Sequence, residues 1–142
     1  MKKIFIMIVV ISAICLKGFS QKLKESEVPS AVKASFEKIY PGISAKWEKE
    51  KENYEAEFKK DGKSMSTLIE PSGTMLETEI SIKESELPAA AKSYLKTNYK
   101  DRHIKGTAKI TGSDGGVTFE AEIDGKDVIF DNAGKFLKEV KE

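Results

Sequence analysis

The chain has 142 residues, of which 24 are lysine or arginine and 23 are aspartate or glutamate, giving a formal net charge of +1. This near-neutral charge, with both signs mixed along the chain, argues against a nucleic-acid-binding protein, which needs a concentrated basic face. A single histidine, His103, and a single cysteine exclude a Cys/His metal site. We expect His103 to lie on the surface or in a turn.

Residues 1–20 have the pattern of a secretory signal peptide. Two lysines form a short basic head, residues 4–16 are almost wholly apolar, and small residues precede a cleavage point after Ser20. The apolar run is too short to span a bilayer comfortably. We therefore predict a periplasmic or secreted protein whose mature chain, residues 21–142, has no transmembrane segment.

The single cysteine, Cys15, offers an alternative in which it becomes a lipidated N-terminus, but the preceding Ile14 is bulky where such sites prefer glycine or alanine. Cleavage after Ser20 removes Cys15 together with three lysines. The mature chain of 122 residues then has 21 basic against 23 acidic residues and no disulfide. Packing alone must stabilise it, which is feasible because a chain of this length buries about two thirds of its unfolded surface.

Much of the mature chain occurs twice. Five blocks in the first half recur in the same order in the second half, at an offset of 59 residues in the first two blocks that has grown to 65 in the third. The matched blocks are 27–33 with 86–92, 36–40 with 95–99, 54–58 with 119–123, 61–63 with 124–126, and 72–77 with 133–138. The change of offset indicates an insertion around Gly112–Gly116. The pattern predicts a duplicated module, with a first repeat over residues 21–85 and a second over residues 86–142.

Each repeat is predicted to begin with an amphipathic helix. Apolar residues follow helical spacing over residues 28–40 and again over residues 87–99. A proline occupies the first turn of each, where it loses no hydrogen bond. Ser26 or Glu27 can cap the first helix, and Pro41-Gly42 ends it.

Strands follow each helix, because apolar and polar side chains alternate there as they do in half-buried antiparallel strands. The predicted strands are residues 43–50, 54–58, 64–69 and 75–82 in the first repeat and 104–111, 117–123, 127–130 and 135–140 in the second. Asp61-Gly62 and Asp124-Gly125 are two-residue hairpin signals, and residues 21–27 form a polar lead-in. We therefore predict an α+β fold: two tandem helix-plus-four-strand repeats that form one antiparallel sheet with two helices packed on one face.

Several motifs carry a family resemblance. They are the Val28-Pro29 and Leu87-Pro88 helix starts, the Tyr40-Pro41-Gly42 helix exit, Trp47, the 54–58 strand that leads into Asp61-Gly62, and Ser72-Gly73 before Met75. In these motifs nearly all of the mature chain resembles the PepSY-like, β-lactamase-inhibitor-like family of proteins exported by Gram-negative bacteria. The resemblance implies tandem repeats joined in one curved sheet, similar to β-lactamase inhibitor protein.

The resemblance also implies a way of binding. The inhibitor presses its concave sheet and a hairpin against its enzyme, and an acidic hairpin residue enters the active site. By position, the resemblance implies that residues 59–63 form this hairpin here and that Asp61 is the entering acid. The chain departs from the inhibitor in lacking the cysteines that form its disulfides.

Two carboxylate pairs are candidate ligand-binding groups. Glu55 with Glu57, and Glu120 with Glu122, are spaced at i and i+2, so each pair points to one face of a strand. Such a face could bind Ca²⁺ or a basic partner, since hard cations take several oxygen ligands. The favoured interpretation is that these glutamates are the solvated outer face of amphipathic strands.

Trp47 has two possible roles, and the second repeat has only Gly106 or a nearby small residue in its place. It could anchor an interface, but burial beneath the first helix is favoured because tryptophan is highly buried on average. The candidate partner-binding residues are Asp61, Lys63, Trp47, Asp124 and Lys126.

No catalytic constellation occurs in the sequence, so we predict a protein that is not an enzyme and has no cofactor and no assigned metal ligands. The function favoured is an exported binding module that engages a protein or peptide through its sheet face and hairpins. One alternative is an inhibitor of a secreted or periplasmic hydrolase that uses Asp61. Another is a Ca²⁺ or small-ligand binder that uses the acidic strand face.

Overall fold

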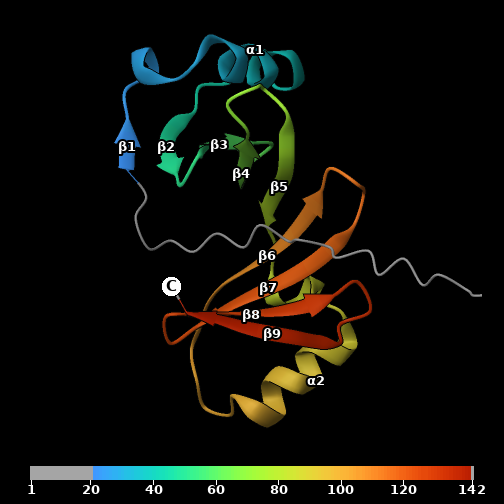
Figure 1. Cartoon of the computed structure of the whole chain (residues 1–142). Coiled ribbons are helices and arrows are strands. Elements are labelled where there is room, and N and C mark those ends of the chain that lie inside the picture. The colour runs from blue at the N-terminus through green and yellow to red at the C-terminus, as the bar shows by residue number, and fades with distance from the viewer. Residues whose placement is uncertain (1–20, 142) are drawn as a thin grey trace, which may run out of the picture.

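Within the described residues, nine strands form a single antiparallel sheet in which each strand pairs with its neighbours in sequence (Figure 1). The structure is a computed structural model and describes residues 21–141. The strands are β1 (Gln21–Leu23), β2 (Lys46–Glu50), β3 (Asn53–Lys60), β4 (Lys63–Ile69), β5 (Met75–Ser81), β6 (Ile104–Gly112), β7 (Val117–Ile123), β8 (Lys126–Asp131) and β9 (Phe136–Lys141). The predicted signal peptide and Cys15 lie outside the described residues.

Helices α1 (Ser30–Ile39) and α2 (Ala89–Asn98) pack on the same face of this sheet. The strand register shows this, because directly paired residues on neighbouring strands point to the same face of a sheet. Starting from Ala56, which lies beneath α1, the successive partners on β4, β5, β6 and β7 are Thr67, Thr78, Thr111 and Val117. Val117 shares its side of β7 with Ala121, which packs beneath α2. The predicted α+β fold with both helices on one face is confirmed. In Figure 1 the two helices lie at opposite ends of the curved sheet.

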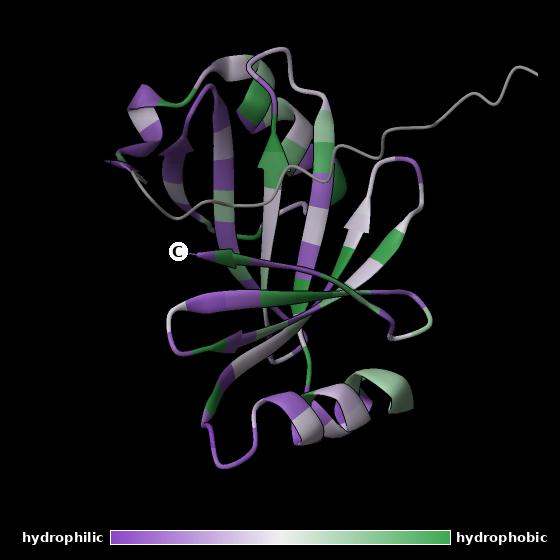
Figure 2. Ribbon diagram, turned by 60° about the horizontal axis from the view of Figure 1, so that its bottom comes forward, coloured by the Kyte–Doolittle hydropathy of each residue, from purple (hydrophilic) through white to green (hydrophobic). Residues whose placement is uncertain are grey.

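Each helix has its own hydrophobic core. The buried residues of the first are Val28, Val32, Phe36, Tyr40, Trp47, Ala56, Phe58 and Ile69. Those of the second are Leu87, Ala91, Leu95, Ala121, Ile123, Val128 and Phe130. The alternation of hydrophilic and hydrophobic residues that places these side chains beneath the helices is visible along the strands in Figure 2. No helix within residues 21–141 is long and apolar enough to cross a membrane.

The helices begin later than predicted. Pro29 is the residue before α1, with an extended ψ of 143°, and the residue before a proline is itself pushed toward extended backbone. Glu27 caps a short 3₁₀ turn (Glu25–Glu27) instead of the helix, where its carboxylate accepts a hydrogen bond from the backbone N–H of Lys24 at 2.7 Å. The same turn and hydrogen bond recur at Glu84–Glu86, so the repeat extends further toward the N-terminus than the matched blocks.

The polar lead-in contains a strand that the sequence did not predict. Leu23 of β1 pairs with Trp47 of β2 and packs against the first core. In the second repeat, the backbone N–H of Ile82 donates to the carbonyl of Thr107 at 3.0 Å.

Thr107, and not Gly106, is the counterpart of Trp47, because Thr107 pairs with Ala121 as Trp47 pairs with Ala56. A bulge at this point of β6 shifts the register by one residue.

Both predicted Asp-Gly hairpins are confirmed. Asp61 and Gly62 have φ values of 51° and 77°, and Asp124 and Gly125 have φ values of 55° and 71°. Two successive residues with positive φ form the type I′ turn that matches the twist of the flanking strands.

Candidate functional site

The face of the sheet opposite the helices carries a group of glutamates in its first half. Side chains alternate along each strand, so residues between those of the core point to this helix-free face. Glu48 on β2 lies directly opposite Glu55 on β3. On β4, Ser66 and Leu68 lie between the glutamates of β3 and those of β5. We call the following set the acidic face: Glu48, Glu50, Glu55, Glu57, Glu77 and Glu79.

Several carboxylates of the acidic face are shielded from water. Glu50 and Glu55 are only 7% and 9% exposed. Burial raises the pKa of Glu55 to about 7, a hydrogen bond with the Ser66 side chain opposes this rise, and the neighbouring charges of Glu50, Glu57 and Glu79 add to it. The interpretation of Glu55 as a solvated outer-face residue is therefore wrong.

Glu77 on β5 is perturbed in the same way. Burial raises its pKa to about 7, and the charges of Glu79, Glu50 and Glu55 add to the rise in that order. Near neutral pH both carboxyl groups are therefore close to half-protonated. This part of the sheet concentrates negative charge at a cost in free energy.

A groove of about 800 Å³ opens over part of this face. Its wall includes the loop at residues 42–45, and its polar lining includes Lys46, Glu55, Glu57, Ser66, Glu79 and Ser81. Carboxylate oxygens of Glu48, Glu55 and Glu57 lie within 4.8 Å of one another beside it. Among the described side chains, these three glutamates have the spacing needed to hold a metal ion.

The second predicted carboxylate pair lies in different surroundings. Glu120 and Glu122 of β7 are on the same helix-free face, in the second half of the sheet, but the β6 residues opposite them are Ala108 and Gly106. Glu122 forms an ion pair with Lys105. The structure therefore brings Glu55 and Glu57 together with Glu48, whereas no acid of β6 joins the second pair.

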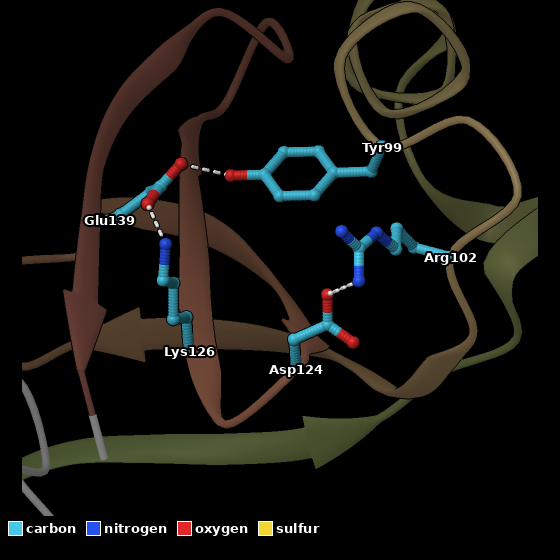
Figure 3. Close-up of polar contacts among 5 residues, drawn as sticks. All are labelled: Tyr99, Arg102, Asp124, Lys126 and Glu139. Carbon is cyan, nitrogen blue, oxygen red and sulfur yellow. Dashed lines mark hydrogen bonds and ion pairs between the residues drawn. The ribbon is translucent and has the colours of Figure 1, made fainter.

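The two predicted binding hairpins also differ from each other. The Asp61 side chain is 85% exposed and contacts Lys60 of the same turn at 3.4 Å; Lys63 is exposed beside it. Asp124, in contrast, forms an ion pair with Arg102, just beyond α2, at 3.1 Å (Figure 3). The second hairpin is therefore held against the end of α2, and the first is not so attached.

Lys126 belongs to a further polar cluster beside the second hairpin (Figure 3). Its ammonium group lies 3.1 Å from one carboxylate oxygen of Glu139, and the Tyr99 hydroxyl donates to the other. The hydrogen bonds from Tyr99 and Lys126 lower the pKa of Glu139. Burial, followed by the hydrogen bond with Glu139, raises the pKa of Tyr99. We interpret these contacts as structural links between α2, β8 and β9.

Trp47 is not available to anchor an interface. It is 6% exposed, and its ring makes an edge contact with Phe36 of α1, with ring centroids 5.4 Å apart. The favoured prediction, that Trp47 belongs to the core, is confirmed, and its place among the partner-binding residues is wrong. His103 is exposed, as expected.

Four glutamates of the acidic face were missed by the sequence analysis. Glu48 with Glu50, and Glu77 with Glu79, have the same i and i+2 spacing as the pairs that were identified. That spacing was the available signal. The sequence did not reveal that β2, β3 and β5 bring three such pairs to one side of the sheet.

Similar solved structures come from Bacteroides species. A "putative periplasmic" protein of Bacteroides eggerthii is 18% identical with a TM-score of 0.70, over 80% of this chain and 88% of that chain. A DUF2874 family protein of Bacteroides uniformis is 15% identical with a TM-score of 0.70, over 79% and 88% of the two chains. A BLIP-like protein of Bacteroides fragilis is 22% identical with a TM-score of 0.63, over 87% and 89%. At these identities the likeness shows a shared fold alone.

None of the curated proteins matches the chain. The family described as "Putative beta-lactamase-inhibitor-like, PepSY-like" matches residues 16–76 and, in a second copy, residues 70–138. These two matches span most of the sequence and reproduce its internal repeat. The chain belongs to this PepSY-like family.

Proposed function

We propose that this protein is an exported, non-catalytic binding module that engages a protein partner through the acidic face of its sheet. The observation that carries the proposal is the concentration of six glutamates on the helix-free side of β2, β3 and β5. They lie beside a groove whose lining includes Glu55, Glu57 and Glu79. Such a surface is costly to maintain, because like charges on neighbouring strands repel each other.

The chemistry of this face indicates a partner with a basic segment. A lysine or arginine side chain that enters the groove would pair with carboxylates that are already partly removed from water. An electrostatically complementary partner would also be steered toward the face during encounter. The predicted signal peptide, and the periplasmic description of the Bacteroides eggerthii protein, support a location outside the cytoplasm.

Affinity capture from the native envelope fraction, with partners identified by mass spectrometry, tests the proposal. The wild-type protein and a Glu57→Lys, Glu79→Lys variant are compared, with Glu52→Lys as a control outside the acidic face. We expect a partner that is retained by the wild type and the control, is lost with the double variant, and elutes with salt. Retention that is equal in all three proteins, or no retained partner at all, would contradict a role for this face.

Inhibition of a hydrolase is a second candidate, favoured by the exposure of Asp61 at the tip of a tight hairpin. The family description and the BLIP-like structural relative support it. If a hydrolase is captured, its inhibition is measured with wild type and Asp61→Ala, with Asp124→Ala as the matched hairpin control. Unchanged inhibition by Asp61→Ala would remove Asp61 from this role.

A further inference from the structure

Three carboxylates from two adjacent strands converge at one point of the acidic face. Glu48 and Glu55 are direct cross-strand partners, and Glu57 follows on the same face of β3. Their carboxylate oxygens all lie within 4.8 Å of one another. An ion at the centre of three such oxygens would be at most about 2.8 Å from each, and an inward shift of a few tenths of an ångström brings this to the 2.3–2.6 Å typical of Ca²⁺–oxygen bonds. The side chains therefore need little rearrangement to share one ion.

A fourth carboxylate gives an independent reason to expect a cation here. Glu50 lies on the same side of β2 as Glu48 and is 7% exposed. Its Oε2 atom is buried and has no hydrogen-bond partner among the described residues. Its cross-strand partner is Asn53, two residues before Glu55 on the same side of β3, so Glu50 lies diagonally beside the Glu48–Glu55 pair. Buried carboxylate oxygens are normally hydrogen-bonded, paired or bound to metal.

We propose that Glu48, Glu55 and Glu57 bind one Ca²⁺ ion on the acidic face, with the buried carboxylate of Glu50 beside it. The available ligands are carboxylates and a neighbouring serine hydroxyl, with no histidine or cysteine, which suits a hard cation. Ca²⁺ accepts irregular coordination, whereas Mg²⁺ requires a near-ideal octahedron of shorter bonds. The adjoining groove leaves room for water molecules to complete the coordination shell. This site does not depend on whether the face also binds a protein.

The second repeat supplies a matched control. Glu120 and Glu122 of β7 correspond to Glu55 and Glu57 of β3. The residue opposite Glu55 is Glu48, whereas the residue opposite Glu120 is Ala108. The second repeat therefore lacks the acid on the neighbouring strand. We expect no site there.

Isothermal titration of the purified protein with CaCl₂, and separately with MgCl₂, tests the proposal. We expect a dissociation constant for Ca²⁺ of about 10⁻⁴–10⁻³ M, the range of extracellular calcium modules, and much weaker binding of Mg²⁺. Glu57→Gln, at an exposed position, should weaken Ca²⁺ binding by about tenfold or more, and Glu48→Gln should do the same. Glu122→Gln should change it by less than about twofold; these fold-changes follow from the loss of one charged ligand.

Thermal unfolding gives a second measurement, because a ligand that binds only the folded state raises Tm. Removal of a glutamate relieves charge repulsion and so changes Tm even without metal. The quantity compared between variants is therefore the rise in Tm on adding about 10 mM CaCl₂. We expect a rise of several degrees for the wild type and Glu122→Gln, and a much smaller one for Glu57→Gln. The proposal is overturned if the wild type shows neither heat nor a Tm shift with CaCl₂, if MgCl₂ acts equally, or if Glu122→Gln loses as much as Glu57→Gln.

Discussion

Replacing Glu77 by glutamine should stabilise the protein at alkaline pH and have little effect under acidic conditions. The pKa of Glu77 rises from 4.5 to about 7 on folding, first because of burial and then because of the charges of Glu79, Glu50 and Glu55. The folded protein therefore retains a proton between these pH values that the unfolded chain has lost. Its stabilising effect is fully present below pH 4.5 and is lost as the pH rises through about 7.

The size of the effect follows from the shift. A rise of this size corresponds to about 3 kcal/mol of unfolding free energy above the folded-state pKa, and because Glu77 is only partly buried we expect about 1 to 3 kcal/mol. Glutamine has the shape of the neutral acid and cannot ionise, so Glu77→Gln should gain this amount at pH 8 and almost nothing at pH 4. For a chain of this length each kcal/mol raises Tm by about 3 to 5 °C.

The assay is urea unfolding of wild type and Glu77→Gln at both pH values without added divalent cations. Glu52→Gln, in the exposed turn between β2 and β3, serves as the control and should show no pH-dependent difference from the wild type. The quantity that decides is the difference in unfolding free energy between variant and wild type at the two pH values. If that difference is the same at both, the raised pKa of Glu77 is wrong.

Three further predictions concern packing and polar links. Trp47→Ala should cost about 3 to 5 kcal/mol in urea unfolding, because a large side chain is removed from a closed core; a loss below about 1 kcal/mol would contradict its burial. Gly73→Ala should lower Tm more than Gly115→Ala. Both glycines have positive φ, but a Cβ at Gly73 would lie 2.7 Å from the Ser35 hydroxyl oxygen, whereas no atom of residues 21–141 lies within 4 Å of a Cβ at Gly115. Tyr99→Phe should raise the pKa of the Glu139 carboxyl, measured by NMR titration, because it removes one of the hydrogen bonds that lower it; an unchanged titration would mean that this hydrogen bond does not form in solution.

Local chemistry made much of the fold predictable. The Asp-Gly pairs require two successive positive φ values, which few other residue pairs allow, and both hairpins form where they were expected. The two helices and most of the strands were predicted from the spacing of apolar residues alone. β1 escaped prediction because its three residues, Gln21–Leu23, are too few to show alternation, and it forms by pairing with β2.

The candidate site was only half visible in the sequence because it depends on long-range pairing. Spacing shows that Glu55 and Glu57 share one face of their strand, but it does not show which strand lies beside them. The register places Glu48 opposite Glu55. Only strand β4 lies between Glu55 and Glu77, so Glu77 is close enough for the charge of Glu55 to raise the pKa of Glu77. The burial of Glu50 and Glu55 arises from the same arrangement, and no local pattern indicates it.

The difference between the two repeats locates the specialised surface of the protein. Both copies retain the features that folding requires: the 3₁₀ turn, the helix, the Asp-Gly hairpin and the apolar residues beneath each helix. They differ on the helix-free face, where the first copy has Glu48 opposite Glu55 and the second has Ala108 opposite Glu120. A duplicated fold needs no cluster of repelling carboxylates, and the raised pKa values of Glu55 and Glu77 indicate that the ionised cluster opposes folding. Local features that reduce stability without aiding the fold are expected at functional sites, which makes the acidic face of the first repeat the place to seek a ligand.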